Sequence, residues 1–231
     1  MTLPRSTTAV LLFTRSAGGE AVHKRFVPHG TLAANAAVAA QLIARATEVA
    51  QQAGADFLCV ESAQQVGRTF GERLTAAITH SFGLGYEQLI VIGNDCPQLS
   101  PGRLRQALHL LASADAVLGP ATDGGVYLLG IKRAFFDAQA WRGLPWQTGK
   151  LGPALARCLR AARARLHILR PLADVDTAQD LAGTIAQLPA GQLRTRLRRL
   201  RATPPVLALG HPALRLATPA LHLPQRAPPS H

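Results

Sequence analysis

The sequence has few aromatic residues, few acidic residues and few lysines, and each shortage limits what the chain can be. Aromatic side chains make up only 5% of the 231 residues, so a core must be built mainly from Ala, Leu, Val and Ile. Hydrophobic residues make up 48% and charged residues 16%, which is typical of a globular chain rather than a disordered one. This length is enough for one domain with a well-formed core, and we expect one domain and a tail.

Cysteine pairs and long apolar runs are also lacking. The three cysteines are widely spaced and form no Cys-x-x-Cys pair, which argues against a disulfide framework or a zinc knuckle and favours a reducing cytoplasm. The first residues lack the basic, apolar and small-residue order of a signal peptide, and no apolar run approaches the ~20 residues that cross a bilayer. We therefore expect a cytoplasmic protein with no membrane span.

Acidic residues are outnumbered, at 13 against 25 Lys and Arg, and the net charge is +12. Such an excess attracts nucleic acid, anionic lipid or phosphorylated small molecules and does not choose among them. Five arginines lie between residues 194 and 201, and no acidic residue follows Asp180. Because much of the positive charge is at this end rather than over the fold, nucleic acid is not expected as a partner.

Short apolar runs alternate with longer helical patterns, which is typical of a parallel sheet covered by helices. We expect a three-layer α/β/α sandwich with a mostly parallel central sheet over residues 1–190, and a basic, Pro-rich tail over 191–231 whose residues 193–201 have a helical pattern. The predicted strands span residues 8–13, 56–60, 88–92, 116–118, 126–131 and 166–169. The predicted helices span residues 32–53, 70–80, 104–112, 134–140, 151–162 and 177–187.

Acidic motifs follow the predicted strands. Asp95 comes directly after the strand 88–92, in the segment 93–97 (GNDCP). Ligands of open α/β sheets lie outside the carboxyl ends of the strands, so Asp95 is placed to hold a hard divalent cation. Alternatively, it only caps the turn before the next helix.

The turn 123–125 (DGG) and the segment 174–177 (DVDT) carry further carboxylates. Consecutive glycines let a ligand approach the backbone, with Asp123 as an acceptor or base, although Asp-Gly is also a common hairpin turn. Asp174 and Asp176 point the same way in extended chain, which suits a metal. Asp176 or Thr177 can also cap the helix that follows.

Two polar segments are weaker candidates. The loop at 65–73 opens a helix, where Arg73 is available to a phosphate or, alternatively, forms a structural ion pair with Glu72 or Glu61. Trp146 either forms the wall of an acceptor pocket or covers the edge of the core.

Taken in order, these motifs resemble a family of glycosyltransferase-like proteins with the GT-A, nucleotide-diphospho-sugar transferase fold, some of them labelled arsenosugar-biosynthesis glycosyltransferases. The resemblance covers about residues 8 to 187. It rests on the segments 65–67, 71–73, 93–97, 123–127, 145–146, 174–177 and 180–181. The sequence departs from the family at residues 14–26, where a Lys, a Pro-Gly and a Lys-Thr-Arg-Leu run are usual, and at Thr69, where an Asp is usual.

The resemblance implies metal-dependent glycosyl transfer from a nucleotide-diphosphate sugar to a small-molecule acceptor. Mg²⁺ or Mn²⁺, held by Asp95 with Asp174 or Asp176, would stabilise the departing nucleoside diphosphate. We predict Asp123 and Asp95 as catalytic residues. The predicted nucleotide- and sugar-binding residues are Arg15, Arg25, Gln65, Gly67, Arg73, Asn94, Gly124, Gly125 and Trp146. Two alternatives stay open: nucleotidyl transfer from a nucleoside triphosphate to a phosphorylated small molecule, and a non-catalytic scaffold.

Overall fold

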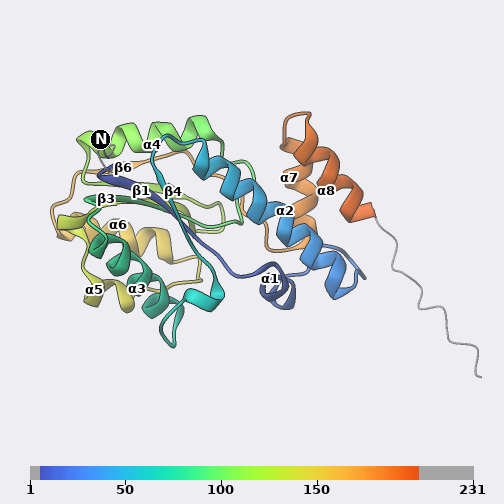
Figure 1. The fold of residues 1–231 in the computed structure, drawn as a ribbon, viewed down its shortest axis with the longest axis horizontal. Coiled ribbons are helices and arrows are strands. Elements are labelled where there is room, and N and C mark those ends of the chain that lie inside the picture. The colour runs from blue at the N-terminus through green and yellow to red at the C-terminus, as the bar shows by residue number, and fades with distance from the viewer. Residues whose placement is uncertain (1–5, 203–231) are drawn as a thin grey trace, which may run out of the picture.

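The computed structural model describes residues 6–202, which form an α/β fold around one six-stranded sheet (Figure 1). The strand order is β2-β1-β3-β5-β4-β6, and every strand except β5 runs parallel to the others. The sheet is therefore mixed but mostly parallel, as the sequence predicts. The strands are β1 (Thr8–Phe13), β2 (Asp56–Val60), β3 (Gln88–Ile92), β4 (Ala116–Pro120), β5 (Val126–Lys132) and β6 (Leu166–Ile168).

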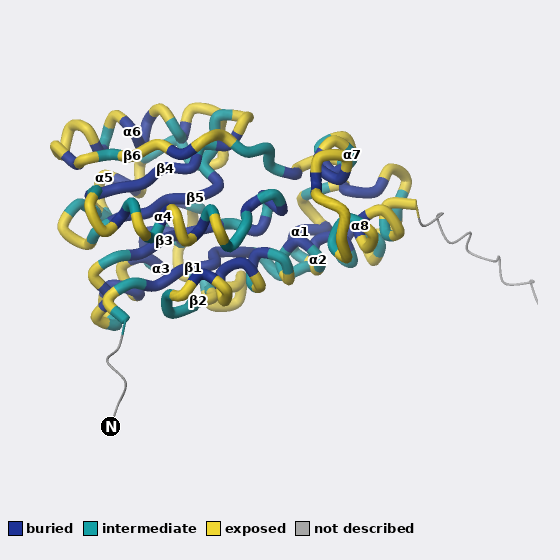
Figure 2. The backbone as a smooth tube through the Cα atoms, turned by 90° about the horizontal axis from the view of Figure 1, so that it is seen from above, coloured by how far each residue is buried: buried dark blue, intermediate teal, exposed yellow. Residues whose placement is uncertain are grey.

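Helices cover both faces of this sheet, with α2 and α4 on one side and α3, α5 and α6 on the other (Figure 1), and the central strands between them are largely buried (Figure 2). The predicted helix over 134–140 is instead a 3₁₀ turn (Arg133–Phe135) followed by α5. The helices are α1 (Ala17–His23), α2 (Leu32–Gln51), α3 (Phe70–Gly83), α4 (Pro101–Ser113), α5 (Ala138–Arg142), α6 (Leu151–Ala161), α7 (Ala178–Gln187) and α8 (Gln192–Ala202).

Alternation along the central strands divides the core into two layers. In β1, Leu11 and Phe13 pack with α3 and α6, while Val10 and Leu12 pack with α2 and α4. Side chains of a strand point to opposite faces in turn, so one short apolar run supplies both layers. This double burial explains why the strands read as nearly continuous hydrophobic runs.

Helix α1 is absent from the sequence-based prediction. Its residues include Gly18 and Gly19, which are poor helix formers, so the pattern indicates a loop. The helix begins because the Ser16 side chain caps it by accepting a hydrogen bond from the Gly19 N–H. This short helix places Glu20 and Lys24 one turn apart.

A third apolar cluster lies beyond the sheet, between the first half of α2 and helices α7 and α8. Leu197 of α8 is fully buried in it, together with Val38 and Leu42 of α2. Thus α8, which follows the predicted boundary at residue 190, packs against the helices before it. The division of the chain at 190 stays a prediction, and residues 203–231 of the predicted tail lie outside the described residues.

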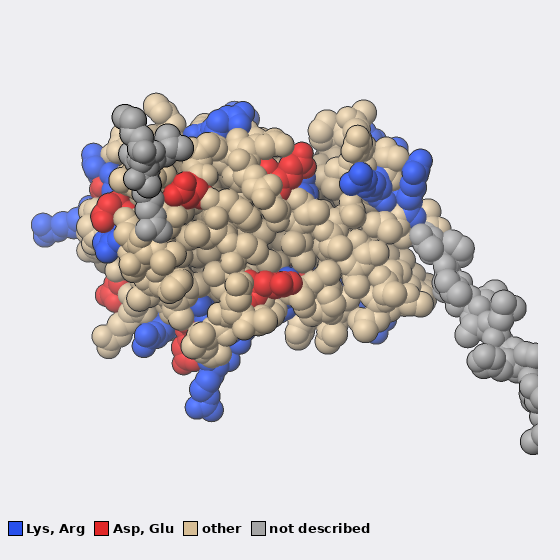
Figure 3. All heavy atoms as spheres, viewed as in Figure 1, with Lys and Arg blue, Asp and Glu red and all other residues tan. Residues whose placement is uncertain are grey.

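Charge is unevenly spread over the described surface. Figure 3 shows Lys and Arg side chains gathered over the α7–α8 end, where the arginines of 194–201 lie. Within residues 6–202, no helix is both long and apolar enough to cross a membrane.

Candidate active site

A cavity of about 300 Å³ opens at the ends of β1 and β3, where the sequence places its polar motifs. This is the carboxyl edge of the parallel strands, the usual ligand position in such sheets. Of the predicted site residues, Arg25, Gly67 and Gly124 do not line the cavity. Those that do are Arg15, Gln65, Arg73, Asn94, Asp95, Asp123, Gly125, Trp146, Asp174 and Asp176.

Backbone hydrogen bonds bring the three acidic segments together. The Val175 N–H donates to the Asp95 carbonyl oxygen at 2.8 Å, which fixes the segment 174–176 beside the end of β3. The Thr122 N–H donates to the Leu172 carbonyl oxygen at 3.0 Å, which brings in the turn 123–125. The meeting of these segments is therefore built into the main chain rather than left to the carboxylates alone.

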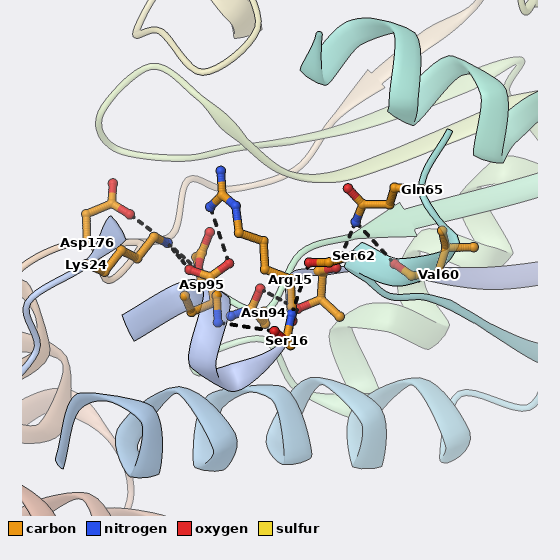
Figure 4. Close-up of polar contacts among 12 residues, drawn as sticks. Arg15, Ser16, Lys24, Val60, Ser62, Gln65, Asn94, Asp95 and Asp176 are labelled. Carbon is orange, nitrogen blue, oxygen red and sulfur yellow. Dashed lines mark hydrogen bonds and ion pairs between the residues drawn. The ribbon is translucent and has the colours of Figure 1, made fainter. Parts of the chain in front are cut away.

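Lys24 lies at the centre of the acidic cluster. Its Nζ is 2.5 Å from Asp95 Oδ1, 2.8 Å from Asp176 Oδ1 and 3.7 Å from Glu20 Oε2 (Figure 4). Burial by itself would lower the pKa of Lys24, but the charges of Asp95, Glu20 and Asp176 outweigh it and raise that pKa above its usual value. Lys24 is therefore a permanent cation between two of the predicted metal ligands.

Asp123, Asp174 and Asp176 form the group best arranged to hold a metal ion. One oxygen from each lies within 4.8 Å of the others. Burial and the negative charge of Asp123 raise the pKa of Asp174 to about 6, as expected for a half-buried carboxylate close to other carboxylates. Three carboxylates at this spacing fit a hard divalent cation, whose bonds to oxygen are ~2 to 2.6 Å long.

Asp95 is not in that group of three. Its Oδ1 is buried and contacts Lys24, although 38% of its side chain is exposed. The sequence-based prediction paired Asp95 with Asp174 or Asp176 around the ion and gave Asp123 a separate role. The structure gathers Asp123 with Asp174 and Asp176 and leaves Asp95 beside the lysine.

The turn carrying Asp123 depends on close backbone contact. Asp123 Oδ1 accepts a hydrogen bond from the Gly125 N–H at 2.7 Å. Gly124 has a φ of +91°, and a Cβ added there would meet the Gly149 carbonyl oxygen at 2.1 Å. The Gly124 carbonyl oxygen accepts from the Gly152 N–H at 3.0 Å. Gly124 thus joins the turn to the loop before α6 instead of facing the cavity.

Aromatic side chains form one wall of the cavity. The ring centroids of Phe70 and Trp146 lie 5.8 Å apart, and those of Phe13 and Phe70 lie 5.6 Å apart. Trp146 Nε1 donates to the Trp141 carbonyl oxygen at 2.7 Å, so its polar group is already satisfied. The ring offers an apolar surface in a fixed orientation.

Polar side chains support the end of β1. Gln65 Nε2 donates to the Thr14 carbonyl oxygen at 2.8 Å, and the Thr14 hydroxyl donates to Asn94 Oδ1 at 3.0 Å. Arg73 donates to the Arg68 carbonyl oxygen at 3.2 Å. Thr69, where the resembling family has an Asp, caps α3 by accepting from the Glu72 N–H. A threonine therefore supplies the cap that an aspartate would supply.

Two charged residues of this site are missing from the sequence-based list. Glu20 is 3% exposed and lies 3.5 Å from Arg15 and 3.7 Å from Lys24. The second is Lys24, four residues after Glu20 in the chain. Residues four apart lie on the same face of a helix, so Glu20 and Lys24 would be recognised as an ion pair if the sequence predicted α1. By contrast, Arg25 is exposed and bridges Thr177 through its backbone.

Residues 28–148 match the model of a family described as an uncharacterized protein conserved in bacteria (DUF2064). The chain belongs to the DUF2064 family. The matched range includes Gln65, Asn94, Asp95, Asp123 and Trp146, but not the segment that carries Asp174 and Asp176. None of the curated proteins matches this DUF2064 chain.

Three solved structures resemble this DUF2064 chain to different degrees. A protein from Desulfovibrio desulfuricans, provisionally named a nucleotide-diphospho-sugar transferase, has 22% sequence identity and a TM-score of 0.75, over 84% of this chain and 95% of its own. Rv0371c from Mycobacterium tuberculosis, in complex with manganese, has 16% identity and a TM-score of 0.46, over 76% and 97%. A cytidylyltransferase from Leptospira borgpetersenii has 8% identity and a TM-score of 0.42, over 85% and 94%. The fold is that of nucleotide-diphospho-sugar transferase structures.

Proposed function

We propose that this DUF2064 protein is a metal-dependent glycosyltransferase that takes its sugar from a nucleotide-diphosphate donor and gives it to a small-molecule acceptor. One observation carries the proposal. Three carboxylates from two distant segments, Asp123, Asp174 and Asp176, converge within 4.8 Å at a cavity that Arg15 and Lys24 also line. A cation site beside fixed positive side chains is what a diphosphate requires.

The role of the metal is to neutralise charge. Bound by Asp123, Asp174 and Asp176, Mg²⁺ or Mn²⁺ would supply the positive charge that stabilises a departing nucleoside diphosphate. The crowded carboxylates, with the pKa of Asp174 raised, fit such an ion. The Gly125 N–H holds Asp123 in position for it.

The chain's own residues orient and enclose the donor. Arg15, whose side chain is 27% exposed, reaches the cavity from the end of β1 and donates hydrogen bonds to the diphosphate. The wall formed by Phe70 and Trp146 excludes water from one side and offers flat apolar surface to a sugar or a base.

Thermal unfolding with Mn²⁺ and a panel of nucleotide sugars tests the proposal. A ligand at about 100 times its dissociation constant adds about 2.7 kcal/mol to the free energy of unfolding. For a chain of this size that is a rise in Tm of roughly 5 to 10 °C. We expect the rise to require metal and nucleotide together, and to be lost in Asp174→Asn. The matched control is Glu87→Gln, which alters an exposed carboxylate beside the first residue of β3, at the end away from the cavity. Absence of any metal-dependent stabilisation across the panel would refute the proposal.

Nucleotidyl transfer is a second candidate, favoured by the positions of Arg15 and Lys24. Both follow β1, and both lie within 4 Å of the buried carboxylate of Glu20. Two cations held at the end of the first strand suit a triphosphate. Release of pyrophosphate from a nucleoside triphosphate would support this reaction, whereas release of a nucleoside diphosphate from a nucleotide sugar supports glycosyl transfer.

A further inference from the structure

We propose that Lys24 is a built-in cation that keeps Asp95 out of the metal site, so that a divalent ion is bound by Asp123, Asp174 and Asp176 without Asp95. This inference rests on the metal site of the proposed function and refines it. It reassigns Asp95 from metal ligand to partner of a lysine.

The first argument is the position of the ammonium group. Lys24 Nζ touches Asp95 Oδ1 at 2.5 Å and Asp176 Oδ1 at 2.8 Å, so these two oxygens are no farther apart than the sum of those distances. One cation can bridge two carboxylate oxygens only up to about 5 Å apart, twice the length of a metal–oxygen bond, and it then lies between them. The lysine therefore stands where an ion bridging Asp95 and Asp176 would have to lie (Figure 4).

The second argument is that Lys24 is held in place from below. The Lys24 N–H donates to the Glu20 carbonyl oxygen at 2.8 Å, and the Glu20 carboxylate lies 3.7 Å from the ammonium. Glu20 is 3% exposed, and a carboxylate buried that deeply is strongly destabilising without a cation beside it. If Lys24 left, Glu20 would keep Arg15, 3.5 Å away, as its other cationic partner, so Lys24 is one of two cations beside this buried carboxylate.

The third argument concerns Asp95. Its Oδ1 is buried, and the contact that it makes there is with Lys24, whose side chain is 12% exposed. A divalent ion on the same oxygen would have to displace the ammonium or lie directly against it, and two cations at that distance repel each other. By contrast, Asp123 is exposed and Asp174 is half-buried, so both are open to an ion arriving from solvent.

Asp176 is the shared member of the two groups. One of its oxygens faces Lys24, and it also belongs to the group of three carboxylates. Lys24 and the metal ion therefore lie on either side of one carboxylate. Each cation reduces the attraction of the Asp176 carboxylate for the other. Removal of the lysine charge should therefore raise the affinity for the metal ion.

A double-mutant cycle on the full chain tests the inference, with Mn²⁺ alone as the probe and its affinity measured by electron paramagnetic resonance and calorimetry. We expect Lys24→Met, which keeps the length of the side chain without its charge, to bind Mn²⁺ about tenfold tighter than the natural chain. We expect Asp95→Asn to change the affinity less than about threefold when Lys24 is present, but to weaken it about tenfold or more in the Lys24→Met background. A tenfold change corresponds to about 1.4 kcal/mol. Lys24→Arg, which keeps the charge, should restore the natural behaviour.

Equal weakening by Asp95→Asn in both backgrounds would overturn the inference, as would an unchanged affinity in Lys24→Met. If Lys24→Met does not fold, Lys24→Met with Glu20→Gln removes both buried charges together, and its affinity is compared with that of Glu20→Gln alone. Asp174→Asn separates the two proposals. If it binds Mn²⁺ as tightly as the natural chain, the metal site itself is wrong. If it loses Mn²⁺ while the cycle shows no coupling, only the role of Lys24 is wrong.

Discussion

Gly124→Ala should destabilise the protein and weaken metal binding, because the turn that carries Asp123 has no room for a side chain. At a φ of +91°, alanine is strained by about 1 to 3 kcal/mol. The added Cβ would lie 2.1 Å from the Gly149 carbonyl oxygen, which is backbone and has to move. That movement breaks the hydrogen bond from the Gly152 N–H to the Gly124 carbonyl oxygen, worth about 1 kcal/mol.

Together these effects should lower the free energy of unfolding by roughly 2 to 4 kcal/mol. The measurement is urea denaturation followed by circular dichroism, with Mn²⁺ affinity measured on the same sample. Gly183→Ala is the matched control, because Gly183 lies exposed within α7 and a Cβ there meets nothing within 4 Å. That substitution should stabilise the helix by about 0.5 to 1 kcal/mol. If the two alanine variants shift stability in the same direction, the reasoning about the turn is refuted.

Two further predictions concern groups outside the metal site. Hydrogen bonds from Arg165 hold the pKa of Asp115 well below its usual range, so its contribution to stability is present above about pH 4 and is lost as the pH falls through the lowered value. Asp115→Asn should therefore flatten the fall in Tm between about pH 5 and 2, and an unchanged slope would contradict this account. Burial raises the pKa of Cys96 to about 12, whereas Cys59 is exposed, so iodoacetamide at pH 8 should alkylate Cys59 first. Peptide mass spectrometry checks the order, and equal labelling of both thiols in the folded protein would count against it.

Much of the fold follows from local patterns that tertiary packing does not override. The predicted strands match β1, β2 and β3 to the residue. β1 and β3 are runs of apolar residues buried on both faces, whereas β2 lies at the edge of the sheet and is only partly buried. The reversed direction of β5 follows from the short turn over residues 121–125 that joins it to β4, because a parallel neighbour would need a crossover of a dozen or more residues. Helix α1 was hidden by its two glycines and is stabilised by the Ser16 cap and its packing on α2.

The candidate site was predictable in position but not in its pairing of charges. Strand ends indicate which edge receives Asp95, Asp123 and Asp174, and the structure places all three at one cavity, where their roles stay predictions. Which carboxylate faces the lysine depends on α1, whose course brings Lys24 over the end of β3. A pattern of residue types cannot supply that distance, because it depends on packing between segments some 70 residues apart in the chain.

Val175 stands between Asp174 and Asp176 and is fully buried among the residues of α2, α7 and α8. The two acidic residues thus flank a buried valine that packs in the apolar cluster of α2, α7 and α8 rather than in the cavity. Any rearrangement of α2, α7 and α8 that moves Val175 would move the carboxylates of Asp174 and Asp176 together. The distance between the two carboxylates is accordingly set by apolar packing at the far end of the protein. A substitution at Leu197, in the same apolar cluster as Val175, would therefore change the affinity for the ion.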